Sequence, residues 1–169
     1  MLITKIIQRL YKLFLSPTSY AKKMGVTVGE NCKLGTKEFG SEPYLISIGD
    51  NFYSSSNIQF VTHDGSVHVL RNLYKEHEKS DYFGRIIIGN NVFIGYGCII
   101  LPGTCVGDNV IIGAGSIVKG SLKNDSVYAG VPARYICSIK EYENKVKPHL
   151  APTKGLSFNE KKQYLKSFK

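Results

Sequence analysis

Long apolar runs are missing from this 169-residue chain: no stretch reaches the roughly 18 consecutive apolar residues of a membrane-spanning helix. Residues 1–15 also lack the uninterrupted apolar stretch and the small-residue cleavage site of a secretory signal. The four cysteines include no CxxC pair, which indicates reduced thiols. Together these absences favour a cytoplasmic protein, in which we expect Cys98 and Cys105 to be small core residues.

Acidic residues are absent from residues 1–23, which carry five lysines or arginines. They are also few in residues 138–169, which carry eight lysines against three glutamates. The net charge of +9 therefore lies at the two ends, and the middle of the chain is nearly neutral. A nucleic-acid-binding protein more often carries a basic stripe interleaved with aromatic residues on its folded body. The charge pattern thus argues against a nucleic-acid partner.

Glycine is abundant, with 17 copies, and it recurs at a fixed spacing. Between Ile88 and Val118 an aliphatic residue followed by glycine returns every six residues, with a second aliphatic residue near the fifth place. A helix cannot keep apolar residues in phase at this period, whereas a coil of very short strands can. The repeat predicts a parallel β-helix, in which each inward aliphatic side chain stacks on its equivalents in the neighbouring coils.

Fainter copies at Val28-Gly29, Leu34-Gly35 and Ile48-Gly49 extend this solenoid back to about residue 26, with two interruptions. Three hexads would make one coil with three flat faces, and glycine, asparagine and aspartate would occupy its turns because they tolerate positive φ. We therefore predict an all-β fold. Its domains are a helical cap at 1–24, the β-helix at 25–137 and a basic tail at 138–169. A β-sandwich with coincidental spacing is the alternative.

The N-terminal residues are predicted to form an amphipathic helix, with Lys5, Arg9 and Lys12 on a face of their own. We favour its interpretation as a cap, because the open end of a solenoid needs to be covered. The alternative is a basic helix that lies on an anionic membrane surface. The apolar residues at helical spacing are Leu2, Ile3, Ile6, Ile7, Leu10, Leu13 and Phe14.

In the C-terminal tail, Ser157-Phe158-Asn159-Glu160 predicts a capping box that starts a short lysine-rich helix through Phe168. Pro148, Pro152 and Gly155 mark the stretch before it as a linker. We interpret the helix as a solvated or partner-packed tail.

The repeat stops between Val61 and Arg85, and a segment of roughly 20 residues expelled from a regular coil usually serves a function. His63 lies at the coil's edge just before this segment, and a neutral imidazole can take a proton from a hydroxyl at physiological pH. His63 is therefore a candidate general base. Asp64 need not orient its ring, because adjacent residues on an extended chain point to opposite faces. His68 could contact His63 without touching the substrate itself, and we interpret His77 as an ordinary surface residue.

The run from Ile88 to Arg134 resembles the left-handed β-helix acyltransferases of the hexapeptide-repeat superfamily. The likeness covers roughly residues 26–137 and is greatest to the maltose, galactoside and xenobiotic acetyltransferase branch, which includes O-acetyltransferases of bacterial polysaccharides. The motifs that match in order are Ile48-Gly49-Asp50-Asn51, Thr62-His63-Asp64-Gly65-Ser66, Ile88-Gly89-Asn90-Asn91-Val92-Phe93-Ile94-Gly95, Leu101-Pro102-Gly103, Gly113-Ala114-Gly115-Ser116-Ile117-Val118 and Ala129-Gly130-Val131-Pro132-Ala133-Arg134.

This resemblance implies a homotrimer with three active sites in clefts between neighbouring coils, where acetyl-CoA lies along the cleft and the expelled loop reaches the adjacent subunit. It also implies that His63 is the base that deprotonates an acceptor hydroxyl. Asn57 is a loose match to an asparagine near the acceptor or thioester. The resemblance assigns the thioester and pantetheine to the amides of Tyr96 and Ala114, and the phosphates to Lys119 and Arg134. The positions that the resemblance assigns to acetyl-CoA binding are Gly95, Tyr96, Gly113, Ala114, Lys119, Pro132 and Arg134, and no metal is implied.

The function we predict is acetyl-CoA-dependent O-acetylation of a carbohydrate, such as a precursor of a capsular or other surface polysaccharide. Two departures limit what is inherited: Phe93 replaces a frequent tryptophan, in a chain with none, and Asp-Gly-Ser rather than His-Pro follows His63. The alternatives are an N-acetyltransferase of a nucleotide-linked amino sugar, an antibiotic acetyltransferase and a non-catalytic scaffold. A zinc enzyme like the γ-type carbonic anhydrases is a remote alternative. It is considered because those enzymes use histidine pairs five residues apart, and His63 and His68 have this separation.

Overall fold

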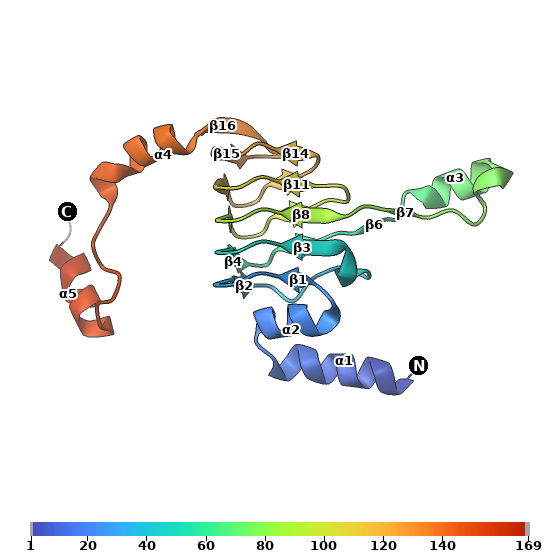
Figure 1. The fold of residues 1–169 in the computed structure, drawn as a ribbon, viewed down its shortest axis with the longest axis horizontal. Helices are drawn as coiled ribbons and strands as arrows, with labels where there is room; N and C mark the ends of the chain where they lie inside the picture. The colour runs from blue at the N-terminus through green and yellow to red at the C-terminus, as the bar shows by residue number, and fades with distance from the viewer. Residues whose placement is uncertain (1, 168–169) are drawn as a thin grey trace. The chain divides into compact units, whose positions relative to one another are not determined.

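The computed structural model describes residues 2–167, without the side chains of residues 2–5 and 8. The chain divides into two compact units, Met1–Ile139 and Lys140–Lys169. In the first unit, short parallel strands stack around a common core (Figure 1). The strands form three sheets, called A, B and C. From β3 to β15, with the ribbon of β6 and β7 excepted, successive strands pass through these sheets in a repeating order, which confirms the β-helix-like coil with three faces.

The three sheets hold the strands of successive coils side by side. Sheet A contains β1 (Thr27–Val28), β3 (Ile46–Ile48), β8 (Ile86–Ile88), β11 (Cys105–Val106) and β14 (Ser121–Leu122). Sheet B contains β2 (Lys33–Gly35), β4 (Tyr53–Ser56), β9 (Phe93–Ile94), β12 (Val110–Ile112), β15 (Ser126–Ala129) and β16 (Arg134–Ser138). Sheet C contains β5 (Gln59–Phe60), β10 (Ile99–Ile100) and β13 (Ile117–Val118). All these pairings are parallel except that of β16, which folds back antiparallel on β15.

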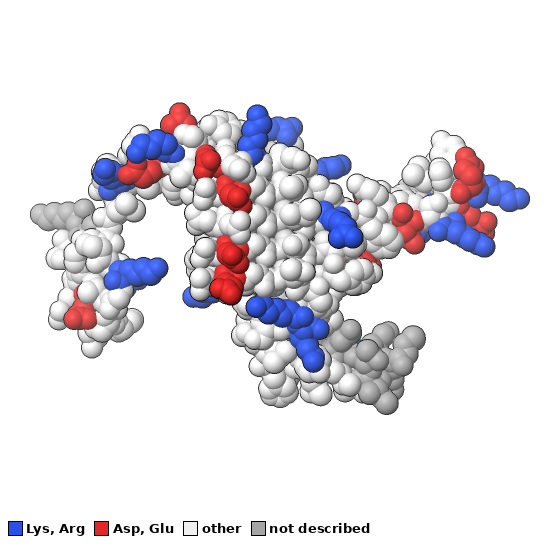
Figure 2. Space-filling view, viewed as in Figure 1, with Lys and Arg blue, Asp and Glu red and all other residues white. Residues whose placement is uncertain are grey.

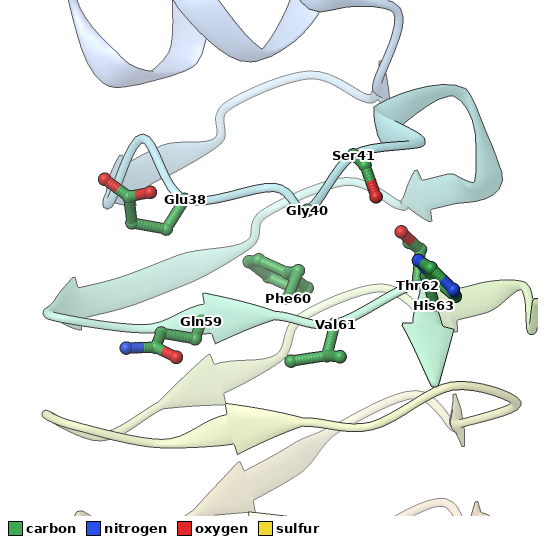
Figure 3. Close-up of a pocket in the computed structure, with 8 residues that line it drawn as sticks. All are labelled: Glu38, Gly40, Ser41, Gln59, Phe60, Val61, Thr62 and His63. Carbon is green, nitrogen blue, oxygen red and sulfur yellow. The ribbon is translucent and has the colours of Figure 1, made fainter. Parts of the chain in front are cut away.

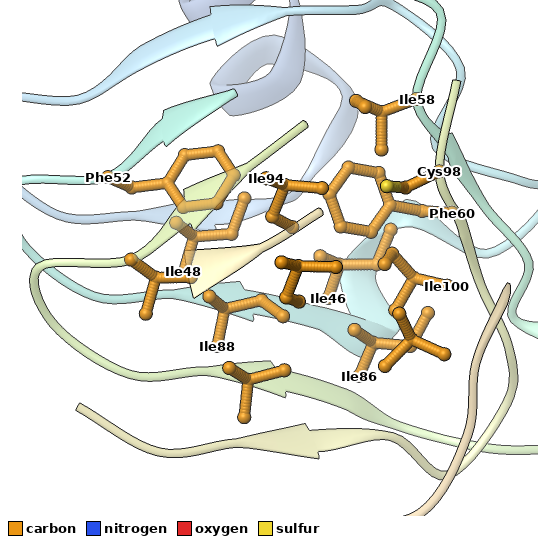
Figure 4. Packing of buried hydrophobic residues seen from close by; sticks show 14 of the residues in the cluster. Ile46, Ile48, Phe52, Ile58, Phe60, Ile86, Ile88, Ile94, Cys98 and Ile100 are labelled. Carbon is orange, nitrogen blue, oxygen red and sulfur yellow. The ribbon is translucent and has the colours of Figure 1, made fainter. Parts of the chain in front are cut away.

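Strand register stacks equivalent inward side chains on one another. On sheet C, Phe60 pairs with Ile100 and Ile100 with Val118, and each is at most 2% exposed. Figure 4 shows isoleucines and phenylalanines of successive coils packed together in the core. The core is therefore a column along the coil, as the six-residue spacing predicts.

The four cysteines are all free, but only one of the two expected core thiols lies in the core. Cys98 is fully buried, and burial raises the pKa of its thiol. Cys105 is exposed, so the prediction that it packs in the core is wrong. The reason is the alternation of side chains along β11, where Val106 takes the inward position and turns Cys105 outward.

The corner between sheets A and B is formed by a column of residues with left-handed backbone. Their φ angles lie between 54° and 56°, a region that asparagine and aspartate tolerate. Their side chains also connect the coils: Asn91 donates to Asn109 and Asn109 donates to Asp125, each at 2.8 Å. The column consists of Asn31, Asn51, Asn91, Asn109 and Asp125.

Two helices precede the coils, and the second covers them. In α2 (Pro17–Met24), Tyr20 and Ala21 are buried, and the Tyr20 ring stacks on Phe39 with centroids 6.2 Å apart. Helix α1 (Leu2–Phe14) lies beyond α2 (Figure 1), and of its described side chains only Tyr11 packs against the core. Within the helical cap that we expected at residues 1–24, α2 is thus the part that mainly covers the coils. None of the helices in the described part of the chain is both long and apolar enough to cross a bilayer.

The regular coils are interrupted in two places, as predicted. The first interruption contains the 3-10 helix η1 (Pro43–Leu45). The second leaves the coil as an antiparallel ribbon of β6 (His63–Asp64) and β7 (Tyr82–Phe83), and it carries α3 (Val67–Leu73) and η2 (Lys75–His77) rather than an unstructured loop. Because the ribbon is expelled, Ile46 of β3 pairs directly with Ile86 of β8.

The C-terminal unit contains more helix than expected. Helix α4 (Ile139–Val146) and the 3-10 helix η3 (Lys147–His149) precede α5 (Phe158–Ser167). The predicted capping box is present: Ser157 N donates to Glu160 Oε2 at 2.8 Å, and Glu160 N donates to Ser157 Oγ at 3.4 Å. Hydrogen bonds from the side chain and backbone of Ser157 lower the pKa of the Glu160 carboxyl. Phe168, the expected end of this helix, lies outside the described residues.

Candidate active site

His63 is held where the chain leaves the coil. It follows Thr62, which is 1% exposed and whose hydroxyl donates to Glu42 at 2.9 Å. Across the ribbon His63 pairs with Phe83, and the two rings lie 4.9 Å apart in a tilted arrangement. The imidazole is about one-third exposed, at 37%. The first strand of the ribbon and an aromatic neighbour thus position the ring, which stays partly accessible.

Asp81 is an acidic residue close to this ring, and sequence reasoning missed it. Its Oδ1 lies 3.8 Å from His63 Nε2, which is an electrostatic contact rather than a hydrogen bond. Arg71 of α3 forms an ion pair with the same carboxylate, and Arg71 Nε donates to the Ser80 carbonyl at 2.7 Å. The Asp81 carboxylate can therefore stabilise the positive charge that His63 gains when it accepts a proton.

Asp64 does not serve His63 in this way. Its Oδ1 accepts from the Ser66 amide at 2.9 Å. Hydrogen bonds from Ser66 lower the pKa of Asp64, and Lys119 and His63 lower it further. The expectation that Asp64 need not orient the ring therefore agrees with its contacts. The other two histidines of the expelled segment have different neighbours. His68 is exposed and lies against Asn72, and His77 contacts Tyr74.

Two hollows meet at His63. One has a volume of about 340 Å³ and extends from His63 to Glu38 and Gln59. Figure 3 shows the Thr62 and His63 side chains at one end of this hollow and those of Glu38 and Gln59 at the other. Ser41 lies on the connecting segment above Thr62. The second hollow, of about 280 Å³, lies between His63 and Lys119 and is also lined by Tyr82, Leu101 and Pro102. His63 therefore borders both hollows.

Tyr96 and Ala114 lie one above the other on successive coils, at the corner between sheets B and C. The amides of Gly97 and Gly115 donate to Ser56 and Tyr96 at 3.2 and 2.8 Å. Within the described part of the chain, the amides of Tyr96 and Ala114 themselves donate to no protein acceptor. Both residues are exposed, so two N–H groups are free to bind a ligand.

The glycines beside these two residues let the coils approach closely. A Cβ on Gly95 would lie 2.5 Å from the Ala114 nitrogen, and one on Gly113 would lie 2.9 Å from the Cβ of Ala129. Gly95 and Gly113 therefore permit the close spacing of neighbouring coils. Pro132 follows a cis peptide bond, and Arg134 is exposed at the start of β16 near the same corner.

The structure brings some expected site residues together and separates others. His63 and Lys119 line one hollow, at the C-terminal ends of the sheet C strands. Asn57, Tyr96 and Ala114 precede the sheet C strands and lie at the opposite edge of that sheet. Six residues of extended chain, at most about 20 Å, join Asn57 to His63. Within one chain, His63 and the amides of Tyr96 and Ala114 therefore lie at opposite ends of the sheet C strands.

Comparison with known proteins identifies the family of this fold. Residues 85–120 match the family model for bacterial transferase hexapeptide (six repeats). The chain is 45% identical to protein CapG of Staphylococcus aureus, over 95% of this chain and 93% of that protein. It is 37% identical to the galactoside O-acetyltransferase of Escherichia coli strain K12, over 73% of this chain and 68% of that protein.

A solved structure supports the same assignment. The chain is similar to a galactoside acetyltransferase in complex with coenzyme A, with a TM-score of 0.56 and 31% identity over 75% of this chain and 72% of that one. The sequence resemblance and the coiled fold are thus both confirmed. The chain is an acetyltransferase that belongs to the hexapeptide-repeat family, in the branch that contains galactoside O-acetyltransferase.

Proposed function

We propose that this enzyme transfers the acetyl group of acetyl-CoA to a hydroxyl of a carbohydrate, with His63 as general base. The observation that carries the proposal is the position of His63 between two hollows, with Asp81 held beside its ring by Arg71. A relative in complex with coenzyme A supports the donor, and a galactoside O-acetyltransferase relative supports the acceptor class. The similarity to CapG favours a precursor of a capsular or other surface polysaccharide.

The chemistry follows from these positions. The imidazole of His63 removes the proton of the acceptor hydroxyl as its oxygen attacks the thioester carbonyl, and Asp81 stabilises the imidazolium that forms. Such base catalysis accounts for a rate factor on the order of 10²–10⁴. When the tetrahedral intermediate collapses, the C–S bond breaks, and the leaving thiolate of coenzyme A takes the proton that His63 removed from the acceptor. A free amide such as that of Tyr96 or Ala114, aimed at the oxyanion, contributes roughly 10²–10³.

The donor and acceptor belong to different parts of the site in this proposal. Lys119, which is exposed in the hollow of about 280 Å³, and Arg134 supply positive charge for the phosphates of coenzyme A. The hollow toward Glu38 and Gln59 offers carboxylate and amide groups that can hydrogen-bond sugar hydroxyls, so we assign it to the acceptor.

A trimer and a left-handed coil are part of the same proposal. The free amides and His63 lie at opposite edges of sheet C, so a neighbouring copy is needed to bring an amide-bearing corner to a His63-bearing corner. A cyclic arrangement with this heterologous contact closes on itself and gives every copy one complete site. Asn57 would then act on a neighbour's site rather than on its own.

The substitution His63→Ala tests the proposal. We expect turnover to fall at least about a hundredfold, because the base is lost. Calorimetry should show unchanged acetyl-CoA binding, which weakens when the 3′-phosphate of the donor is removed. His68→Ala is the matched control, because His68 is exposed on α3 and contacts Asn72. Full activity of His63→Ala would refute the base, and absence of acetyl-CoA binding at millimolar concentration would refute the transferase mechanism.

A further inference from the structure

Helix α1 presents an apolar face that the coils do not cover. Leu13 and Phe14 are 72% and 76% exposed, and three more apolar residues of the helix are 40–48% exposed. Only Tyr11 within the described part of the helix packs against the core. Because α2 already covers the first coil, α1 is not needed to close it. The three further residues are Ile6, Ile7 and Leu10.

Positive charge lies next to this apolar face. Residues 1–23 contain five lysines or arginines and no aspartate or glutamate. Arg9 is exposed on the flank of α1, and Lys22 and Lys23 are exposed in the last turn of α2. Lys12 pairs with Glu38 at 2.6 Å, the acidic group that faces the helix from the coils. Figure 2 shows positive side chains over this end of the first unit, whereas negative ones follow one edge of the coils.

The apolar face of α1 and the positive charge beside it together favour one kind of binding partner. An apolar stripe bordered by cations matches the surface of an anionic bilayer, where the apolar side chains enter the acyl boundary and the cations meet the headgroups. A helix of 13 residues is about 20 Å long, so it fits in the plane of the surface and is too short to span. A second copy of this chain would instead bring two acid-free segments of the same charge together.

We propose that α1 binds an anionic lipid bilayer through the face formed by Ile6, Ile7, Leu10, Leu13 and Phe14. This membrane contact is independent of the catalytic proposal, because none of these side chains lines either hollow at His63.

Vesicle flotation of the full chain tests this contact. Phosphatidylcholine vesicles that contain phosphatidylglycerol should bind the protein at least about tenfold more tightly than vesicles of phosphatidylcholine alone. The binding should weaken as ionic strength rises from roughly 0.1 to 1 M, because the screening length falls from about 10 to 3 Å. Absence of binding, or equal binding to both vesicles, would overturn the proposal.

A pair of double variants locates the contact on α1. Leu13→Ser with Phe14→Ser should weaken binding about tenfold or more, since it removes exposed apolar surface without changing charge. Val69→Ser with Leu73→Ser is the matched control on α3, where these residues are 57% and 66% exposed, and it should bind as the parent does. Equal binding by both variants, or loss in the control alone, would contradict the assignment to α1. A smaller oligomer for the α1 variant in sedimentation would mean that a second copy covers the face.

Discussion

At the scale of single residues, the contact between Asp81 and His63 depends on Arg71. The ion pair with Arg71 holds the carboxylate on the side of His63 Nε2, across a ribbon whose strands are joined by α3. Asp64, the acidic neighbour in sequence, is occupied by the Ser66 amide. The ring is therefore supported from the far strand of the ribbon and not from its own.

In the proposed mechanism Asp81 acts through His63, and this role predicts a specific effect on the kinetic constants. The change Asp81→Asn keeps the shape but removes the charge that stabilises the imidazolium, so we expect kcat to fall roughly tenfold. The KM for acetyl-CoA should stay within about twofold, because Asp81 does not line the hollow that contains Lys119. Steady-state kinetics measure both values.

Glu78→Gln is the matched control for this change, because it removes an exposed acidic group from the same segment. It should leave both kinetic constants near those of the parent. A rise in KM for acetyl-CoA with unchanged kcat in Asp81→Asn would contradict the positioning role.

At the scale of the elements, the coils are held at close spacing by glycines at their corners. A Cβ on Gly89 would lie 2.8 Å from the carbonyl carbon of Gly107 in the next coil. The Gly107 backbone cannot move aside as a flexible side chain can, so the spacing between β8 and β11 would have to change. The side chain of Asp108, whose carboxylate accepts from Asn90 N at 2.6 Å, would be displaced as well.

Gly89→Ala should therefore lower the free energy of unfolding by about 1–3 kcal/mol, the usual cost of forcing an extra methyl group into packed structure. Gly65→Ala is the matched control, because no atom lies within 4 Å of the position that its Cβ would take. It should change stability by less than about 0.5 kcal/mol. Urea denaturation followed by circular dichroism measures both, and equal stabilities would contradict the role of close coil spacing.

At the scale of the whole molecule, the separation of His63 from the free amides makes a shared site testable. His63→Ala removes the proposed base, and Ala114→Trp places a bulky side chain at the corner that carries the exposed amide. Each variant alone should be inactive. Mixed oligomers should regain activity at about one site in four, because an intact His63 from one copy then meets an intact Ala114 from another.

Co-expression of the two variants, followed by an activity assay and sedimentation, measures this recovery. A mixture of His63→Ala with the double variant that carries both changes is the control, since it contains no intact His63 and should stay inactive. Failure of the first mixture to recover, with both variants fully oligomeric, would mean that each chain forms its own site.

The candidate site shows which parts of a structure a sequence reveals. The spacing of the hexads located the coils, and the end of the repeat at Val61 located His63 at the coil's edge. The outward position of Cys105 and the helices α3 and α4 were missed. The position of Cys105 depends on which of two alternating strand positions faces the core. The helices α3 and α4 are short, and their apolar pattern is too brief to be recognised in the sequence.

The sequence by itself determined the coiled fold, the acetyltransferase family and the two basic ends. It could do so because a repeat of six residues is a local pattern, and because charge can be counted along the chain. Only the tertiary structure decided that Asp81 approaches His63, that α2 rather than α1 covers the first coil, and that the free amides lie at the opposite edge of sheet C. These three features depend on strand register and packing between residues far apart in the chain, which no local pattern encodes.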